Sequence, residues 1–125
     1  MTTPNPGEEL PSTDQASLDR LKRFGGGKLL HEMVKLFVEA APERIAAAKA
    51  ALASNDVKGV EEALHSLKSS SAQLGAMKMQ RLCEAGETTA RAGSLTNVDV
   101  LVQQLEVEFP SIKTWLENAC SPETT

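Results

Sequence analysis

A histidine, a lysine and three consecutive serines occur together in the stretch HSLKSSSAQLGA, which covers residues 65–76. The spacing of the surrounding apolar residues predicts a helix here, so His65, Lys68 and Ser69 share one face. A neutral imidazole is a good nucleophile, and the Lys68 ammonium supplies positive charge to an anionic group bound to it. Ser69 is small enough to leave room for that group and can donate a hydrogen bond to it. This face therefore suits the receipt of a phosphoryl group on His65.

The other two serines occupy different positions on the predicted helix. A helix turns about 100° per residue, which places Ser71 inside the apolar stripe and Ser70 at its edge. Small side chains at helix contacts allow close approach, and their hydroxyls can bond to the carbonyl four residues earlier. His65 lies about 130° from the centre of the stripe, so we expect it to face solvent.

Several other kinds of site are missing from the sequence. The glycine run at 25–27 is not followed by Lys-Ser or Lys-Thr and follows no strand, so it is no nucleotide-binding loop. The two cysteines, Cys83 and Cys120, lack the spacing of a zinc site or a disulfide framework. His31 has no acidic or cysteine partner at ligand spacing. We expect no metal and no cofactor in this chain.

Composition and charge restrict the class of protein further. The chain has 125 residues, 41% hydrophobic and 3% aromatic, and a net charge of −4. One domain of ordinary size fits this length, and the negative charge argues against nucleic acid or an anionic membrane as the partner. The N-terminus lacks the basic and apolar segments of a signal peptide, and no apolar run reaches membrane-spanning length. We expect a cytoplasmic monomer.

Hydrophobic spacing predicts five helical segments and no strand. Pro, Gly and polar residues indicate disordered tails at 1–13 and 120–125, leaving a helical domain at 14–119. The predicted segments are 14–24, 28–54, 56–74, 78–92 and 97–116. Gly75 should close the third segment, and Pro42 and Pro110 should kink or restart their helices. Four long amphipathic helices with short loops predict an all-α, antiparallel up-and-down four-helix bundle with an additional short N-terminal helix.

The stretch His65-x-Leu67-Lys68-Ser69-Ser70-Ser71-x-x-Leu74-Gly75 resembles the signature of the histidine-containing phosphotransfer (HPt) domain. The segment from Gly26 to Ile45 also resembles the second helix of such domains, and the resemblance covers residues 15–117. It implies that His65 is phosphorylated on Nε2 and that Lys68 assists the phosphoryl group.

The resemblance also implies roles around this histidine. Arg91 matches a position where some members carry a basic residue, Glu87 falls where some carry Gln, and Gly75 belongs to the signature. Ser69 departs from the family, which usually has Gly after the Lys. The added hydroxymethyl group narrows the approach to His65, so transfer should be slower or restricted to certain partners.

The resemblance implies a phosphoryl carrier in a multistep phosphorelay. His65 would accept the group from an aspartate of a receiver domain and pass it to a response regulator, with a hybrid sensor histidine kinase upstream. Mg²⁺ would belong to the receiver, and this chain would have no turnover of its own. One alternative is a helical module that inhibits a kinase or receiver without accepting phosphate; another is a true phosphatase or kinase.

Two surface features have more than one interpretation. Glu61 can orient the imidazole across one turn, or simply belong to a solvated face with Glu62, which we favour. The second helix is apolar on more than one side. This pattern indicates either burial under the first helix or a docking patch for the receiver beside the histidine.

Overall fold

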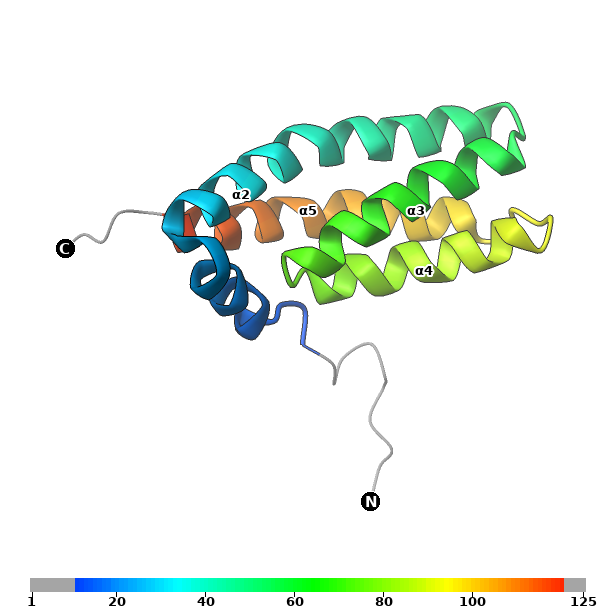
Figure 1. The fold of residues 1–125 in the computed structure, drawn as a ribbon. Coiled ribbons are helices and arrows are strands. Elements are labelled where there is room, and N and C mark those ends of the chain that lie inside the picture. Colours follow the sequence, from blue (N-terminus) through cyan, green and yellow to red (C-terminus); the bar gives the residue numbers. More distant parts are fainter. Residues whose placement is uncertain (1–10, 121–125) are drawn as a thin grey trace, which may run out of the picture.

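The computed structural model describes residues 11–120, all of whose regular elements are helices (Figure 1). The all-α prediction is thereby confirmed. Of the tails predicted at 1–13 and 120–125, residues 1–10 and 121–125 lie outside the described residues. The helices are α2 (Gln15–Ala53), α3 (Val57–Gln73), α4 (Met77–Arg91) and α5 (Val98–Cys120).

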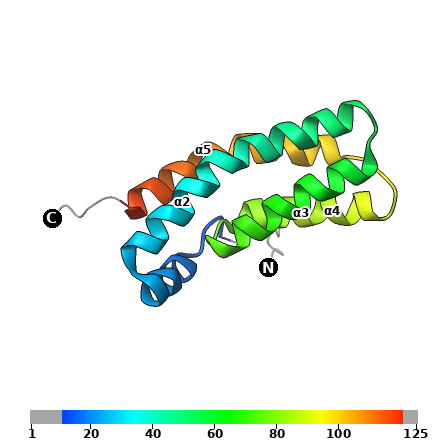
Figure 2. The ribbon, with the colours of Figure 1, turned by 45° about the horizontal axis from the view of Figure 1, so that its top comes forward.

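The four helices pack in cyclic order, each against the helices before and after it, with α5 closing against α2. Consecutive helices are joined by short connections and run in opposite directions, as two views show (Figures 1 and 2). This is the predicted antiparallel up-and-down bundle. Helix α3 packs between α2 and α4. It carries His65 and Lys68, and the adjacent α4 carries Glu87 and Arg91.

Local interactions define both ends of α3. The Asp56 carboxylate accepts a hydrogen bond of 2.9 Å from the Gly59 amide and so caps the first turn. At the other end Gly75 has φ +75°, a left-handed conformation that ends the helix at little cost only for glycine. Both features match the sequence prediction and fix the length of the helix that carries His65.

The two predicted N-terminal helical segments are both present and together make up α2. They are separated, as the glycine run predicts, by a break at Gly26, where φ is 76° and ψ is −177°. Residues 15–25, here called the N-terminal arm, therefore turn away from the long part of α2 (Figure 2). Neither Pro42 nor Pro110 interrupts its helix, although both were predicted to kink or restart it. Helices α2 and α5 continue through these prolines with helical backbone angles.

Residues just before Asp14 contact the connection between α3 and α4. Thr13 forms an isolated β-bridge with Ala76, and the Lys78 amide donates to the Ser12 carbonyl at 3.2 Å. The Asp14 amide donates to the Gly75 carbonyl at 2.8 Å. Residues 11–13 thus lie along the α3–α4 connection, and α5 includes Cys120.

The core consists of aliphatic side chains from all four helices, with aromatic residues at its edge. Phe37 is buried and its ring lies 6.1 Å from that of Phe109, which is only partly buried, as is Trp115. Cys83 is fully buried, and this burial raises the pKa of its thiol to about 12. Within the described residues, no helix combines the length and apolar character needed to span a bilayer.

Candidate functional site

His65 lies near the middle of α3 and faces solvent, as the helical wheel predicts. Its side chain is 60% exposed. The opposite side of α3 is buried in the bundle through residues at three- and four-residue spacing. These buried residues are Val60, Ala63, Leu64, Leu67 and Ser71.

Glu87 of α4 fixes the proton on the His65 ring. Nδ1 of His65 lies 2.7 Å from Oε2 of Glu87. An ionised carboxylate can only accept a hydrogen bond, so Nδ1 is the protonated nitrogen. The lone pair then resides on Nε2, the nitrogen that points away from this contact, and the ring is held in one orientation with a free nucleophilic atom.

Two basic side chains contact the same carboxylate. Lys68 Nζ lies 2.8 Å from Oε1 of Glu87, and the Arg91 guanidinium donates through Nη2 to Oε2. Arg91 also donates through Nε to Oε2 of Glu61 at 3.2 Å. The result is a connected group of five side chains from two helices, with Glu87 at its centre. We call it the His65 cluster: Glu61, His65, Lys68, Glu87 and Arg91.

The Glu87 side chain is only 2% exposed, so its charge depends on these partners. Burial by itself raises the pKa of the Glu87 carboxyl. The hydrogen bonds and positive charge supplied by Lys68 and His65 outweigh burial and hold this pKa below its usual value. Glu87 is therefore a carboxylate at neutral pH, as the assignment of the proton to Nδ1 requires.

The structure brings together three of the residues that the resemblance implied, His65, Lys68 and Arg91, through a fourth, Glu87. Lys68 pairs with Glu87 here rather than standing free beside the imidazole. Glu61 does not orient the imidazole, nor is it merely solvated: it binds Arg91. Glu62 has no part in the cluster.

The central position of Glu87 had a signal in the sequence. Within α4 it lies four residues after Cys83 and three before Ala90, both of which are buried. A glutamate on the apolar stripe of a helix is rarely buried without a charged partner. This pattern predicts a partner on a neighbouring helix without identifying it.

The hydroxyls of Ser69 and Ser70 turn back to the backbone of α3. Ser69 donates to the His65 carbonyl at 3.2 Å, and Ser70 to the Ser66 carbonyl at 3.1 Å. The expected hydrogen bond from Ser69 to a group on the imidazole is thus not formed in this structure. Ser71 is fully buried, as predicted, and its hydroxyl has no hydrogen-bond partner among the described residues.

Gly75 lies apart from the cluster. It is ten residues after His65, which corresponds to about 15 Å along a helix axis. A Cβ at this position would approach the Asp14 carbonyl oxygen to 2.5 Å. Gly75 thus shapes the junction between α3 and the N-terminal segment, and it does not reach the imidazole.

The chemistry of the cluster is that of a nucleophile with adjacent positive charge. Nε2 of His65 is accessible, and Lys68 and Arg91 are close enough to accompany a group bound there. No set of three or more His, Cys, Asp or Glu side chains within residues 11–120 is arranged to hold a metal ion. The arrangement can accept an electrophilic, anionic group such as a phosphoryl group.

Comparison with known proteins identifies similar sequences and folds. The Hpt domain family matches residues 32–119. Histidine-containing phosphotransfer protein B (HptB) from Pseudomonas aeruginosa is 26% identical, with a TM-score of 0.82 over 90% of this chain and 96% of that one. The HPT domain of a sensor hybrid histidine kinase from Shewanella is 19% identical, with a TM-score of 0.74 over 91% and 97% of the two chains, a likeness of fold. No curated protein sequence matches the chain.

Proposed function

The chain belongs to the Hpt domain family, and from this we propose that His65 accepts a phosphoryl group from a receiver-domain aspartate and passes it to a response regulator. Proteins of this family are phosphoryl carriers of two-component phosphorelays. One observation supports the site most directly: Glu87 holds the proton on Nδ1 of an exposed histidine, which leaves Nε2 as the nucleophile.

The transfer step follows from this geometry. The Nε2 lone pair forms a bond to the phosphorus of an aspartyl phosphate, and the bond from phosphorus to the aspartate oxygen breaks. The leaving group is the aspartate carboxylate. Nδ1 keeps its proton throughout, and the Glu87 carboxylate stabilises the positive charge that develops on the ring. The reverse sequence returns the group to the next receiver.

The positive groups of the cluster compensate the incoming charge. Lys68 is one helical turn from His65, and its ammonium can leave Oε1 of Glu87 for an oxygen of the bound phosphoryl group. Arg91 then remains on Glu87 and keeps that carboxylate paired. Phosphoryl transfer depends on alignment and on neutralising the negative charge of the group in transit. Any Mg²⁺ that contributes to this neutralisation would be supplied by the receiver domain.

The experiment is transfer from a phosphorylated receiver to this protein. We expect label on the protein that is lost in acid and kept in alkali, as for a phosphoramidate. His65→Gln should abolish labelling, while His31→Gln, which changes the other histidine of the chain, should leave it unchanged. Labelling that persists in His65→Gln would contradict the assignment of the site.

Two other outcomes would replace the proposal. A protein that is never labelled, yet inhibits a sensor kinase equally well as His65→Ala, would be a binding module. Repeated release of inorganic phosphate would instead indicate an enzyme. Neither result is expected from a cluster that offers a nucleophile and compensating charge but no group placed to activate water.

A further inference from the structure

Arg91 lies at a place where the helix backbone does not by itself fix the position of its side chain. It is the last residue of α4, and Gly93 begins the turn that follows, with φ +89°. The Arg91 side chain is 58% exposed. A long side chain with this exposure has many rotamers to choose from, so it keeps one position only where its contacts hold it there.

Two carboxylates from different helices hold the Arg91 guanidinium. Nη2 donates to Oε2 of Glu87, one turn earlier on α4. Nε donates to Oε2 of Glu61 on α3, at 3.2 Å. The Glu61 side chain is partly buried, so this ion pair is screened less by solvent than one on the open surface. The contact with Glu61 is therefore a second restraint on Arg91, one that runs across the α3–α4 interface.

Lys68 is held less firmly than Arg91. Its ammonium pairs with Oε1 of Glu87 at 2.8 Å, and this is its one ion pair within residues 11–120. Lys68 is released when a single ion pair breaks, whereas Arg91 must give up two carboxylates. Of the two cations in the His65 cluster, Lys68 is thus the one that moves at lower cost.

This difference matters when His65 carries a phosphoryl group. Nη2 of Arg91 and Nδ1 of His65 contact the same oxygen of Glu87, so the guanidinium lies beside the imidazole. An anionic group on Nε2 attracts Arg91 as well as Lys68. If both cations moved to it, the buried Glu87 carboxylate would lose both of its cationic partners, which is costly for a charge that solvent does not reach.

A carrier must also release the group that it accepts. In release, an aspartate oxygen of the receiver forms a bond to phosphorus, the bond from Nε2 to phosphorus breaks, and its electron pair returns to Nε2. Each additional cation that binds the phosphoryl group on His65 stabilises the starting state of this step. Stabilisation of the starting state alone slows the release.

We propose that Glu61 is a positioning residue, which acts by retaining Arg91 on Glu87. Lys68 alone then passes to the phosphoryl group on His65. The phosphohistidine gains one cation rather than two, and it remains able to give the group up. This role deepens the proposed function and rests on it.

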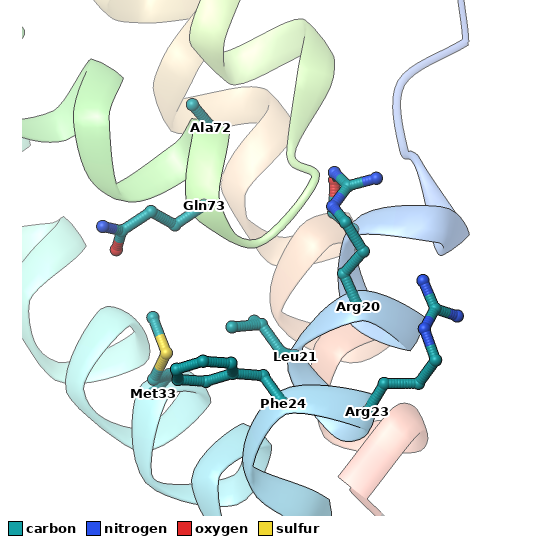
Figure 3. A pocket seen from close by; sticks show the side chains of 8 residues that line it. Arg20, Leu21, Arg23, Phe24, Met33, Ala72 and Gln73 are labelled. Carbon is teal, nitrogen blue, oxygen red and sulfur yellow. The ribbon is translucent and has the colours of Figure 1, made fainter.

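A change at Glu61 acts on the His65 cluster without altering the other end of α3. The N-terminal arm forms a pocket there with Ala72 and Gln73 (Figure 3). Ala72 follows Glu61 by eleven residues, which corresponds to about 16 Å along the helix axis. A variant at Glu61 therefore leaves the arm and this pocket as they are.

The test compares the two directions of transfer in wild type and Glu61→Gln. Forward transfer starts from a phosphorylated receiver. Return transfer starts from protein labelled with phosphoramidate, a small phosphoryl donor, and an unphosphorylated receiver. We expect Glu61→Gln to raise the ratio of forward to return kcat/KM about threefold to fivefold, because the freed Arg91 adds one exposed ion pair to the phosphoryl group. The change should lie chiefly in a slower return step, with KM unchanged.

Two further comparisons show whether Glu61 acts through Arg91. Glu61→Gln added to Arg91→Gln should leave the ratio at the value of Arg91→Gln alone. Glu62→Gln removes the same charge from the next residue, which is exposed and outside the His65 cluster, and it should keep the wild-type ratio. Phosphorus NMR gives a separate readout: the phosphohistidine resonance should move in Glu61→Gln, while Arg91→Gln and the double variant should coincide.

The other outcomes would overturn this role of Glu61 and leave the proposed function intact. An unchanged ratio in Glu61→Gln would do so, as would a change in KM alone, which would make Glu61 a contact of the receiver. An equal shift in Glu62→Gln, or an equal effect of Glu61→Gln in the Arg91→Gln background, would show that Glu61 acts by its own charge. Failure of both the receiver and phosphoramidate to label His65 in wild type would overturn the proposed function itself.

Discussion

Glu87 connects the other four side chains of the His65 cluster, directly or through Arg91, although it is buried and on a different helix from His65. Its negative charge sets the tautomer of the imidazole and holds Lys68 in an ion pair. The same carboxylate is thus both a positioning group for the nucleophile and a part of the folded structure.

The stability of the protein should depend on Glu87 in a pH-dependent way. We expect Glu87→Gln to lower the free energy of unfolding by about 1–2 kcal/mol at pH 7, because it removes charge-assisted contacts. The folded-state pKa of Glu87 lies below the ordinary value of 4.5. The stabilisation is therefore present above that value and is lost as the pH falls through the folded-state pKa.

Urea unfolding of wild type and Glu87→Gln, from neutral pH down to about pH 3, measures this difference. Glu84→Gln, at an exposed position of the same helix, controls for the loss of one negative charge. A difference that stays constant or grows at low pH would contradict the stabilised carboxylate.

Ser69 is the residue at which the chain departs from its family. Its hydroxyl donates to the His65 carbonyl, so only its bulk lies beside the imidazole. We expect Ser69→Gly to raise the rate of transfer from a receiver several-fold by opening this approach. It should also lower the stability of the fold by about 0.5 kcal/mol, because glycine is the poorer helix former.

Rapid-quench transfer kinetics and thermal unfolding measure the two effects. Ser70→Gly removes an equivalent hydrogen bond one position along the helix. It should cost similar stability without a gain in rate. Equal rates for wild type and Ser69→Gly would show that Ser69 does not limit the approach of the partner.

At the scale of elements, the junction between α3 and the N-terminal segment positions the arm. Gly75 has φ +75° and faces the Asp14 carbonyl with no room for a Cβ. Gly26 provides the second turn, between the arm and the long part of α2. These two glycines direct the arm back over the end of α3, so residues of the arm line a pocket together with Ala72 and Gln73.

The two kinds of glycine should respond oppositely to the same substitution. Gly75→Ala should lower the free energy of unfolding by about 2 kcal/mol, since it combines left-handed backbone strain with a steric clash. At Gly27 an added Cβ would meet no atom within 4 Å, and the backbone there has no positive φ. Gly27→Ala should therefore stabilise the protein by about 0.5–1 kcal/mol.

Chemical denaturation of both variants measures these effects. A general preference for alanine over glycine in helices would stabilise both variants. A lower free energy of unfolding for Gly75→Ala together with a higher one for Gly27→Ala therefore shows the effect of backbone conformation. If Gly75→Ala had the same free energy of unfolding as wild type, the junction between α3 and the N-terminal segment would have to relax around the added Cβ at no cost.

At the scale of the whole molecule, the two cysteines report on how tightly the bundle is closed. Cys83 is fully buried with a thiol pKa of about 12, while Cys120 at the end of α5 is only partly buried. Burial also raises the pKa of the Cys120 thiol. Since the thiolate is the reactive form, both should react more slowly than free cysteine, and Cys83 far more slowly than Cys120.

Native-state alkylation at about pH 8 should therefore modify Cys120 first and Cys83 only at the rate of unfolding. In the Cys120→Ser variant, Cys83 is the one remaining cysteine, so its alkylation rate is measured by itself. Similar rates for the two cysteines without denaturant would show that the bundle opens around α4 under native conditions.

The sequence by itself determined the helices, the caps at Asp56 and Gly75 and the outward position of His65, because periodicity and local hydrogen bonds operate within one element. Its family signature also indicated the residues of the site. It also placed the break at the glycine run, where Gly26 interrupts α2. It did not determine that α2 continues through Pro42 with helical backbone angles, since packing on both sides of the proline outweighs the lost hydrogen bond.

Only the tertiary structure decided the contacts between helices. The bond from Glu87 to His65, the pairing of Lys68 and the bond from Arg91 to Glu61 depend on how α4 is rotated and shifted against α3. The periodicity of either helix leaves that rotation and shift undefined. The return of the arm onto the end of α3 is likewise a long-range arrangement that the pattern of a single segment cannot specify.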